Sequence, residues 1–509
     1  MKKNASILMI LTGIISIFGF AKSMTLAYFY GASPIADAYI IGTTVPALLF
    51  AFFGHAVKSG FIPIFGGINE EKGQKPAIDF TNNIISLLTV ALLIAYLFIL
   101  VFASPIVGVL APGLDEDIRK IAIDFTRIIS LSMLLLGLTS VFTAYLNYKN
   151  NYSIPAISII PMDIIILISI YLSAKYNVMF LAYGYLLGSL SQTLTLIPYL
   201  LKSGYSYMVR FELKEENTKA FFILILPIIF SVAVNDINKI VDKSLASLVA
   251  VGGVSALSYS GKLTGFIQST VIISISTVLF PALSKFASSN NLISLKKSMK
   301  ESIKLITLLI VPAIFGIIFF AEDIITLLFG RGEFDQHSIK LTSDALVFYS
   351  IGMIGFGMNS IFSRYFFAMK NSKVPMLSAI YNSIINVTLN FAFYYFTDLG
   401  VAGLALSTSI ASILSSIWLS INVRRIIGSI LDSRELLYIF KILFSSGVMI
   451  ATSKTLSNLI SIYTEIGSNF TIIISIIFAI IIYSLCLIIL KVKKTTQLFN
   501  SLVKKIRRK

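Results

Sequence analysis

Long apolar runs separated by short polar segments are the main pattern of this chain. Runs such as 84–102 and 471–490 consist almost entirely of apolar residues. The two-residue alternation of membrane-spanning strands does not occur in the sequence. Because roughly 20 apolar residues let a helix cross a bilayer, we predict an all-α integral membrane protein with about fourteen transmembrane helices. Their centres lie near residues 18, 48, 92, 134, 164, 190, 232, 268, 313, 354, 385, 412, 447 and 480.

The segments between these spans alternate in charge. One set is rich in cations, and the other set is short and poor in them, as at 31–34, 112–117, 249–253, 330–335 and 397–400. The positive-inside rule places the cation-rich set and both termini in the cytoplasm. The net charge of +17 then reflects orientation and contact with anionic membrane lipids. Nucleic-acid binding is the weaker interpretation of this charge, and we expect no nucleic-acid partner.

Composition excludes several other classes of protein. Hydrophobic residues make up 56% of the 509 residues and charged residues only 13%, about half the charged share of a soluble protein. The first run has no small-residue cleavage site, which favours a retained helix over a signal peptide. Two histidines and the single Cys486 cannot form a zinc cluster, and no phosphate-binding loop motif occurs. We expect a carrier without a cofactor, not an enzyme.

An internal repeat organises the spans. The segment GLTSVFTAYLNYKNNYSIPA (137–156) matches GMNSIFSRYFFAMKNSKVPM (357–376) at an offset of 220 residues. Chance similarity between apolar segments is the alternative. Since the offset contains six spans, the two copies run in the same direction. We predict a six-helix lobe at 1–215, a second at 221–435, and two extra helices with a basic tail at 436–509.

Charged residues interrupt the seventh span, in SVAVNDINKIVDKSLASL (231–248). Six polar residues fall on one side of a helix, within an arc of about 160°: Asn235, Asp236, Asn238, Lys239, Asp242 and Lys243. Ile237 and Ile240 take the other side. A charge at bilayer depth costs about 2.5–3.5 kcal/mol. We therefore expect these residues to face a central water-filled cavity between the lobes. The alternative is that Asp236, Lys239 and Lys243 only pair with one another.

Other ionisable or polar groups are candidates for the same cavity. On the first helix Ser16, Lys22 and Ser23 share one side. His55 and Lys58 lie three residues apart on the second helix. Further along the chain are Lys262 and Arg364. For Lys58 and Arg364 the alternative is snorkelling toward a membrane interface. The predicted cavity holds more cations than anions, which favours an anionic substrate with phosphate groups.

Four motifs resemble one known family. They are GFAKSMTLAYFYGASPIADAY (19–39), VPALLFAFFGHAVKSGFIPIF (45–65), the segment 255–286, and LFGRGEFDQHSIKLTSDAL (328–346) followed by FSRYFFAMKNSKVP (362–375). The chain resembles the MurJ (MviN) lipid II flippases of the multidrug/oligosaccharidyl-lipid/polysaccharide exporter superfamily. The resemblance implies alternating access in the bacterial cytoplasmic membrane. It also implies that undecaprenyl-pyrophosphate-linked peptidoglycan precursor moves to the outer leaflet, for cell wall biogenesis and cell shape.

The resemblance also assigns roles to residues. Lys22 and Ser23 stand where the family commonly has arginine followed by an acid, and Lys262 stands at an essential cation. With the cavity candidates named above, the predicted substrate-binding set is Lys22, Ser23, Lys58, Lys239, Lys262 and Arg364. Lys58 departs from the family, where Ser or Thr is frequent. Asp37 matches the family's aspartate on the second helix and is predicted, with Ser16 and His55, as a gating or structural polar residue. A sodium site maps to Asp242, Asn386, Asn390 and Thr408, with Asn390 where aspartate is usual.

The chain has an expected substrate, an expected coupling ion and two alternative functions. The resemblance implies a lipid-linked glycan substrate, a groove for its lipid tail at the two extra helices, and coupling to Na⁺, H⁺ or the membrane potential. We expect a monomer. A flippase for another polyprenyl-linked oligosaccharide is the first alternative, because the Lys22–Ser23 pair departs from the family. An exporter of small cationic drugs is less favoured, because such a cavity should contain more acids than bases.

Overall fold

A computed structural model describes residues 2–289, 291–430, 432–463 and 467–492 of the chain. Within these ranges, side chains are described except at residues 2–10, 49, 51–53, 55–56, 58–59, 227–236, 273, 277–278, 282 and 468. All regular structure in the described ranges is helical. The predicted all-α architecture is therefore confirmed.

The chain divides into two compact units. The first contains Met1–Ser258 and Arg331–Ser338, and the second contains Tyr259–Gly330 and Ile339–Lys509. The first unit is built from α1 (Lys2–Tyr30), α2 (Pro34–Lys72), α3 (Gln74–Leu110), α4 (Glu116–Ser130), α5 (Ser132–Tyr148), α6 (Ser153–Ile157), α7 (Ile159–Lys175), α8 (Phe180–Lys202), α9 (Glu216–Val249) and the start of α10 (Gly253–Gln268).

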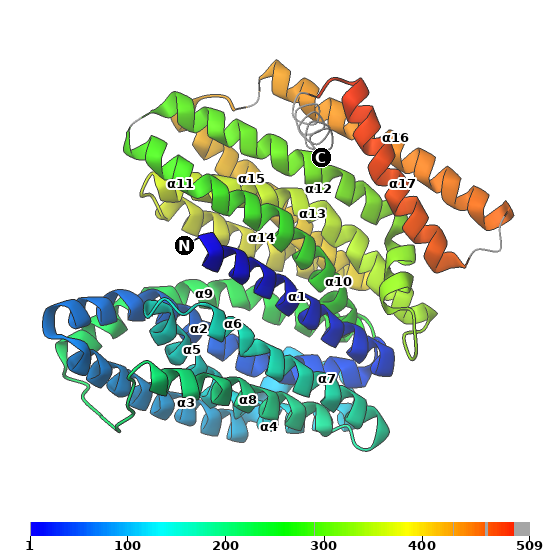
Figure 1. Cartoon of the computed structure of the whole chain (residues 1–509). Coiled ribbons are helices and arrows are strands. Elements are labelled where there is room, and N and C mark those ends of the chain that lie inside the picture. The colour runs from blue at the N-terminus through cyan, green and yellow to red at the C-terminus, as the bar shows by residue number, and fades with distance from the viewer. Residues whose placement is uncertain (1, 290, 431, 464–466, 493–509) are drawn as a thin grey trace. The chain divides into compact units, whose positions relative to one another are not determined.

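The second unit continues α10 and holds the rest of the helices. They are η1 (Ser269–Ile273, a π-helical turn), α11 (Ser274–Ser288), α12 (Leu292–Phe329), α13 (Gln336–Ala368), α14 (Lys373–Phe396), α15 (Gly400–Ile427), α16 (Ser433–Tyr463) and α17 (Ser468–Ile489). Figure 1 shows α16 and α17 side by side, in orange and red. Both pack against α12. The Tyr483 hydroxyl donates to the Leu308 carbonyl at 2.7 Å, and Lys304 pairs with Glu435 at 3.3 Å.

Twelve helical segments among the described residues are long and apolar enough to cross a membrane. The helices α2 and α9, at 39 and 34 residues, are not among these twelve. The count of fourteen spans stays a prediction, as do the lobe boundaries. Three expected spans are interrupted helices, namely α4–α5, α6–α7 and α10–η1–α11.

An aromatic cluster holds the cation-rich ends of the first unit together. Phe61 and Phe65 of α2 stack at 5.4 Å between ring centroids, and Phe61 lies 5.8 Å from Phe80 of α3. Phe65 meets Tyr145 of α5 edge-on at 5.4 Å. All four side chains are fully buried. Their burial, about 1.5–3 kcal/mol for a large apolar side chain, fixes α2, α3 and α5 at this end.

The connection from α8 to α9, residues 203–215, is attached to α3 by asparagine side chains. The amide of Asn83 donates to the Glu212 carbonyl at 2.9 Å and to Thr218 Oγ1 at 2.8 Å, while its Oδ1 accepts from the Glu212 N–H at 2.7 Å. Tyr205 donates to Asn82 at 2.6 Å. The backbone of this connection is therefore fixed without any regular structure of its own.

Candidate functional site

An ion pair joins two helices in the middle of the first unit. Lys22 of α1 donates to the carboxylate of Asp163 on α7. The Asp163 side chain is 2% exposed, whereas the Lys22 side chain keeps 25% of its surface accessible. At 1.5 Å per residue, Lys22 lies about 12 Å from the Tyr30 end of α1. A charge at this depth is costly unless it is paired, and the pairing with Asp163 lowers the free-energy cost of the Lys22 charge.

The two serines predicted beside Lys22 bond to their own helix. Ser23 is buried and its hydroxyl donates to the Gly19 carbonyl at 3.3 Å. The Ser16 hydroxyl donates to the Thr12 carbonyl at 2.9 Å. The acid that pairs with Lys22 is therefore not its neighbour in the chain but Asp163 of α7.

The helix α9 has two different sides, as its periodicity predicts. Lys239 is exposed, Asp242 is half-buried, and Lys243 donates to Thr44 of α2. Ile237 and Ile240 line an apolar groove of about 850 Å³ with α2 and α3. The predicted site residues His55 and Lys58, and Asp236 of the charged stretch, lie outside the described side chains.

Asp37 connects the starts of two helices. It is buried in the first turn of α2. Its Oδ1 accepts hydrogen bonds from the backbone N–H of Ser255 at 2.7 Å and from the Ser255 hydroxyl at 2.6 Å. Ser255 lies in the first turn of α10, where backbone N–H groups have no partner within the helix. A carboxylate is also favoured at this positive end of the helix dipole.

Further contacts tie the cation-poor loops to one another. The Glu333 N–H donates to the Tyr28 carbonyl at 2.9 Å, and the Ala32 N–H donates to Ser338 Oγ at 3.1 Å. The Gly113 N–H donates to Ser247 Oγ at 3.2 Å. We call this set of contacts, together with the Asp37–Ser255 pair, the loop seal. It joins loops on both sides of the sequence repeat.

Two glycines show how closely these loops approach. Gly252 has a φ of +76° and Gly332 a φ of +63°, a region that side chains disfavour. A Cβ on Gly252 would overlap the Ala32 carbonyl, and one on Gly332 would overlap the Tyr28 carbonyl. The loop seal therefore depends on bare backbone at these points.

A pocket of about 810 Å³ lies within the loop seal. Aromatic and charged side chains line it together, including Tyr28, Tyr171, Lys175, Glu333 and His337. Asp335 caps α13 beside it, accepting from the Ser338 N–H at 2.8 Å. Hydrogen bonds from the backbone and the side chain of Ser338 lower the pKa of Asp335 below its ordinary value.

Three of the four residues predicted to bind sodium lie together in the second unit. Asn386 Nδ2 donates to Thr408 Oγ1 at 3.1 Å, and Asn390 Nδ2 lies 3.4 Å from Asn386 Oδ1. Asn386 and Asn390 are buried. The fourth residue, Asp242, belongs to the first unit. Amide and hydroxyl oxygens suit a hard cation, but this set carries no charge, so it fits a sodium ion only if a carboxylate is added.

The remaining predicted cations of the second unit differ in exposure. Lys262 is exposed on α10. Arg364 is half-buried, and its guanidinium lies 5.5 Å from the ring centroid of Phe280 on α11. This cation–π contact holds Arg364 against its own unit.

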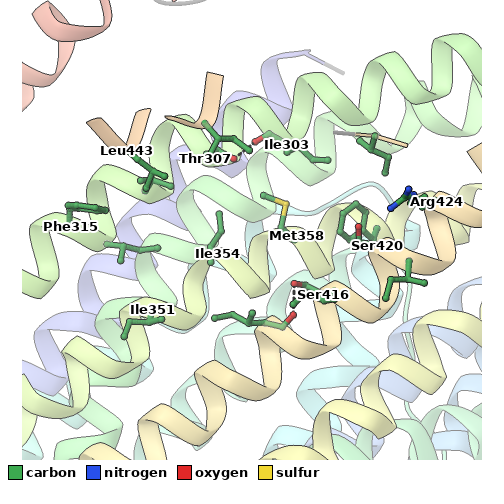
Figure 2. Close-up of a pocket in the computed structure, with 18 of the residues that line it drawn as sticks. Ile303, Thr307, Phe315, Ile351, Ile354, Met358, Ser416, Ser420, Arg424 and Leu443 are labelled. Atoms are coloured by element: carbon green, nitrogen blue, oxygen red, sulfur yellow. Dashed lines mark hydrogen bonds between the residues drawn. The ribbon is translucent and has the colours of Figure 1, made fainter. Parts of the chain in front are cut away.

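An apolar cavity of about 610 Å³ runs between α12, α13, α15 and α16. Figure 2 shows Ile351, Ile354 and Met358 of α13 along its length. Arg424 and Ser420 of α15 lie toward one end. The almost entirely apolar lining suits a long apolar chain.

Sequence reasoning missed Asp163, the acid that pairs with Lys22. The available signal was a single acid in the apolar run IIPMDIIILI (159–168), since an isolated intramembrane charge is usually functional. Within the ranges the structure describes, no three His, Cys, Asp or Glu side chains lie close enough to hold a metal ion.

Comparison with known proteins agrees with this architecture. The family profile described as "Lipid II flippase MurJ" matches residues 26–478. The "Probable lipid II flippase MurJ" of Buchnera aphidicola subsp. Acyrthosiphon pisum is 28% identical over 463 residues, covering 89% of this chain and 90% of that protein. The "Lipid II flippase MurJ" of Burkholderia cenocepacia is 26% identical over 417 residues, covering 80% of each chain.

Solved structures show the same fold. The chain superposes with a TM-score of 0.82 and 25% identity on a structure described as "Lipid II flippase MurJ, inward closed conformation", covering 95% of this chain and 98% of that one. An inward-facing multidrug resistance MATE transporter gives a TM-score of 0.69 at 16% identity, covering 82% of this chain and 95% of the transporter. At that identity the likeness extends to the fold alone.

Proposed function

Because this chain belongs to the MurJ lipid II flippase family, we propose that it moves lipid II from the inner to the outer leaflet of a bacterial cytoplasmic membrane. The observation that carries the proposal is the family match over residues 26–478, nearly the whole described chain. This is a family of transporters, so transport without covalent chemistry is the activity we assign.

Cations hold the pyrophosphate of the substrate in this proposal. Lys22 is the best supported of them, because it is charged, partly accessible and deep in the membrane-spanning part of α1. Lys58, Lys239, Lys262 and Arg364 are assigned the same role from the sequence. Charge-assisted hydrogen bonds from such groups to phosphate are about twice as strong as neutral ones.

The loop seal supports an alternating-access mechanism with both termini in the cytoplasm. In that orientation the loops that form the loop seal face outward. Transport then requires three contacts to break and re-form in each cycle. They are Asp37 with Ser255, Tyr28 with Glu333, and Ala32 with Ser338.

The cavity in Figure 2 supports a place for the lipid tail. It is apolar along α12 and α13 and has Arg424 toward one end. An isoprenoid chain would bury its apolar surface there, at about 25 cal/mol per Å². The extra helix α16 contributes Leu443 and Ile439 to the lining.

Ion coupling rests on the group Asn386, Asn390 and Thr408. The sequence assigns Na⁺ to these residues together with Asp242, and the three residues of the second unit supply neutral oxygens only. If the assignment is correct, sodium raises the Tm of the purified wild type more than potassium does. In Asn386→Ala the Tm should be the same in sodium as in potassium. An equal response to both salts in the wild type would remove sodium from the mechanism.

A second candidate substrate is another polyprenyl-linked oligosaccharide. The observation in its favour is Ser23, which stands where relatives commonly have an acid. Complementation of a bacterium depleted of its own lipid II flippase separates the two. Restored labelling of lipid II at the outer leaflet, lost in Lys22→Ala and Lys262→Ala variants that insert normally, supports lipid II. A wild type that inserts normally and restores nothing points to the other glycan.

A further inference from the structure

We infer that Asp163 is the resident counter-ion of Lys22 and sets how tightly this lysine holds an anionic substrate, so that the substrate can be released. The inference deepens the proposed function and rests on it. It assigns Asp163 as a positioning residue that acts through Lys22.

The first step concerns geometry. Asp163 reaches Lys22 across the α1–α7 interface, and the two residues lie 141 positions apart in sequence. Among the ion pairs of the described side chains, this is the only one formed by Lys22. The two helices also meet at Tyr30, whose hydroxyl donates to Ser173 Oγ at 2.8 Å. The pair therefore has a fixed place in the helix packing.

The second step concerns accessibility. Asp163 is 2% exposed while Lys22 is 25% exposed. The carboxylate is covered, and the accessible part of the pair is on the side of Lys22. An anion can approach Lys22 from that side without first removing Asp163, so the carboxylate and the anion compete for one ammonium group.

The third step concerns charge. The Lys22–Asp163 pair has no net charge, so it attracts a phosphate group less than a lone buried ammonium would. A singly charged ligand gains little by competing with a carboxylate that is already in place. A pyrophosphate carries more charge and more acceptor oxygens, so it can compete successfully with the Asp163 carboxylate for Lys22. When it leaves, Asp163 again satisfies Lys22, which lowers the cost of release.

The test uses full-length protein in detergent and compares the wild type with Asp163→Asn and Lys22→Met. The probes are inorganic pyrophosphate, farnesyl diphosphate and lipid II. Removing the carboxylate should lower the Kd for pyrophosphate about tenfold, equal to ~1.4 kcal/mol, and Lys22→Met should raise it by at least as much. In proteoliposomes, Asp163→Asn should move lipid II more slowly at saturation, because release has become slower.

Tyr30→Phe is the matched control. It removes another side-chain hydrogen bond between α1 and α7 but no charge, and it should leave pyrophosphate affinity at the wild-type value. Asp163→Ser is measured alongside in case the asparagine variant inserts poorly. An unchanged or raised Kd in whichever neutral variant inserts at the wild-type level would overturn the inference.

The probes also separate this inference from the proposed function. If wild-type protein binds inorganic pyrophosphate but neither binds nor moves lipid II, the lipid II assignment fails. The role of Asp163 is then still decided by the pyrophosphate measurements. If lipid II is moved normally and Asp163→Asn binds pyrophosphate like the wild type, the function stands and the role of Asp163 falls.

Discussion

At the scale of single residues, Asp37 shows how one side chain can set a conformational equilibrium. Its carboxylate accepts two hydrogen bonds from Ser255 at the start of α10 and is itself 1% exposed. Few other contacts in the loop seal involve a charge. Asp37 is therefore the residue whose loss should weaken the sealed state most.

Asp37→Ala should make the sealed side more accessible. It leaves the Ser255 N–H without its acceptor, at a cost of about 1–3 kcal/mol. We expect faster labelling by an impermeant maleimide of Ala38→Cys, a fully buried position, in a background where Cys486 is serine. Asp37→Asn keeps a carbonyl acceptor and serves as the control, with labelling close to that of the parent. Equal labelling in Asp37→Ala and the parent would remove Asp37 from the seal.

Residue-scale features were also the least accessible to sequence reasoning. Lys22 and Lys239 could be selected because charges in apolar runs are rare and costly. Asp163, the partner of Lys22, could not be selected in this way. It lies 141 residues further along the chain, and only the packing of α1 against α7 brings it to Lys22. Likewise, Ser23 follows Lys22 in the chain but turns back to the Gly19 carbonyl. Periodicity predicts on which side of a helix a residue lies, but not which atom that residue contacts.

At the scale of elements, buried asparagine side chains attach residues 203–215 to α3, and Asn83 makes more of these hydrogen bonds than Asn82. Asn83 is fully buried and bonds to Glu212, Glu215 and Thr218. By contrast, Arg210 pairs with Asp79 at 2.9 Å where both side chains are about one-third exposed. The hydrogen bond that Arg210 donates to the Glu212 carboxylate raises the pKa of Arg210 above its ordinary value, so Arg210 stays charged at every working pH.

Asn83→Ala should loosen this connection far more than Arg210→Ala. Each buried group that loses its partner costs about 1–3 kcal/mol, whereas an exposed ion pair contributes about 0–1 kcal/mol. Hydrogen–deuterium exchange across 205–215 should rise clearly in Asn83→Ala and barely in Arg210→Ala. A reversed order would show that the ion pair, not the asparagine, holds the connection.

The approach of α7 to α8 provides a second test at this scale. A Cβ on Gly184 of α8 would overlap both Cβ and Oγ of Ser169 on α7. Gly184→Ala should therefore destabilise the protein by about 1–3 kcal/mol through overpacking. Adding Ser169→Gly removes the overlapping atoms and should recover most of the lost Tm. If the double variant were as unstable as the sum of the singles, the two sites would not be in contact.

Element-scale features were largely predictable. Apolar content located the spans, and 3.6-residue periodicity gave the two sides of α9, with Ile237 and Ile240 in an apolar groove. The breaks within α4–α5 and α10–η1–α11 were not predictable. They follow from local packing and leave the hydropathy of the segment unchanged.

At the scale of the whole molecule, transport requires the loop seal to open. Ala32 and Ser338 are close enough for the Ala32 N–H to reach Ser338 Oγ at 3.1 Å. In a chain lacking Cys486, the pair Ala32→Cys and Ser338→Cys should form a disulfide on oxidation and stop the appearance of lipid II at the outer leaflet. Dithiothreitol should restore it, and each single cysteine should transport normally. Full transport by the oxidised double variant would exclude opening at this point.

In the proposed orientation, the pocket within the loop seal is a point of control from outside the cell. A compound filling it would touch Tyr28 and Glu333 at once, and it would lose those contacts when the loops part. Such a compound binds the closed arrangement selectively and stabilises it in proportion to that difference in affinity. It would inhibit transport without entering the cytoplasm or competing with a lipid substrate. Its potency would depend on the fraction of time that the transporter spends in the closed arrangement.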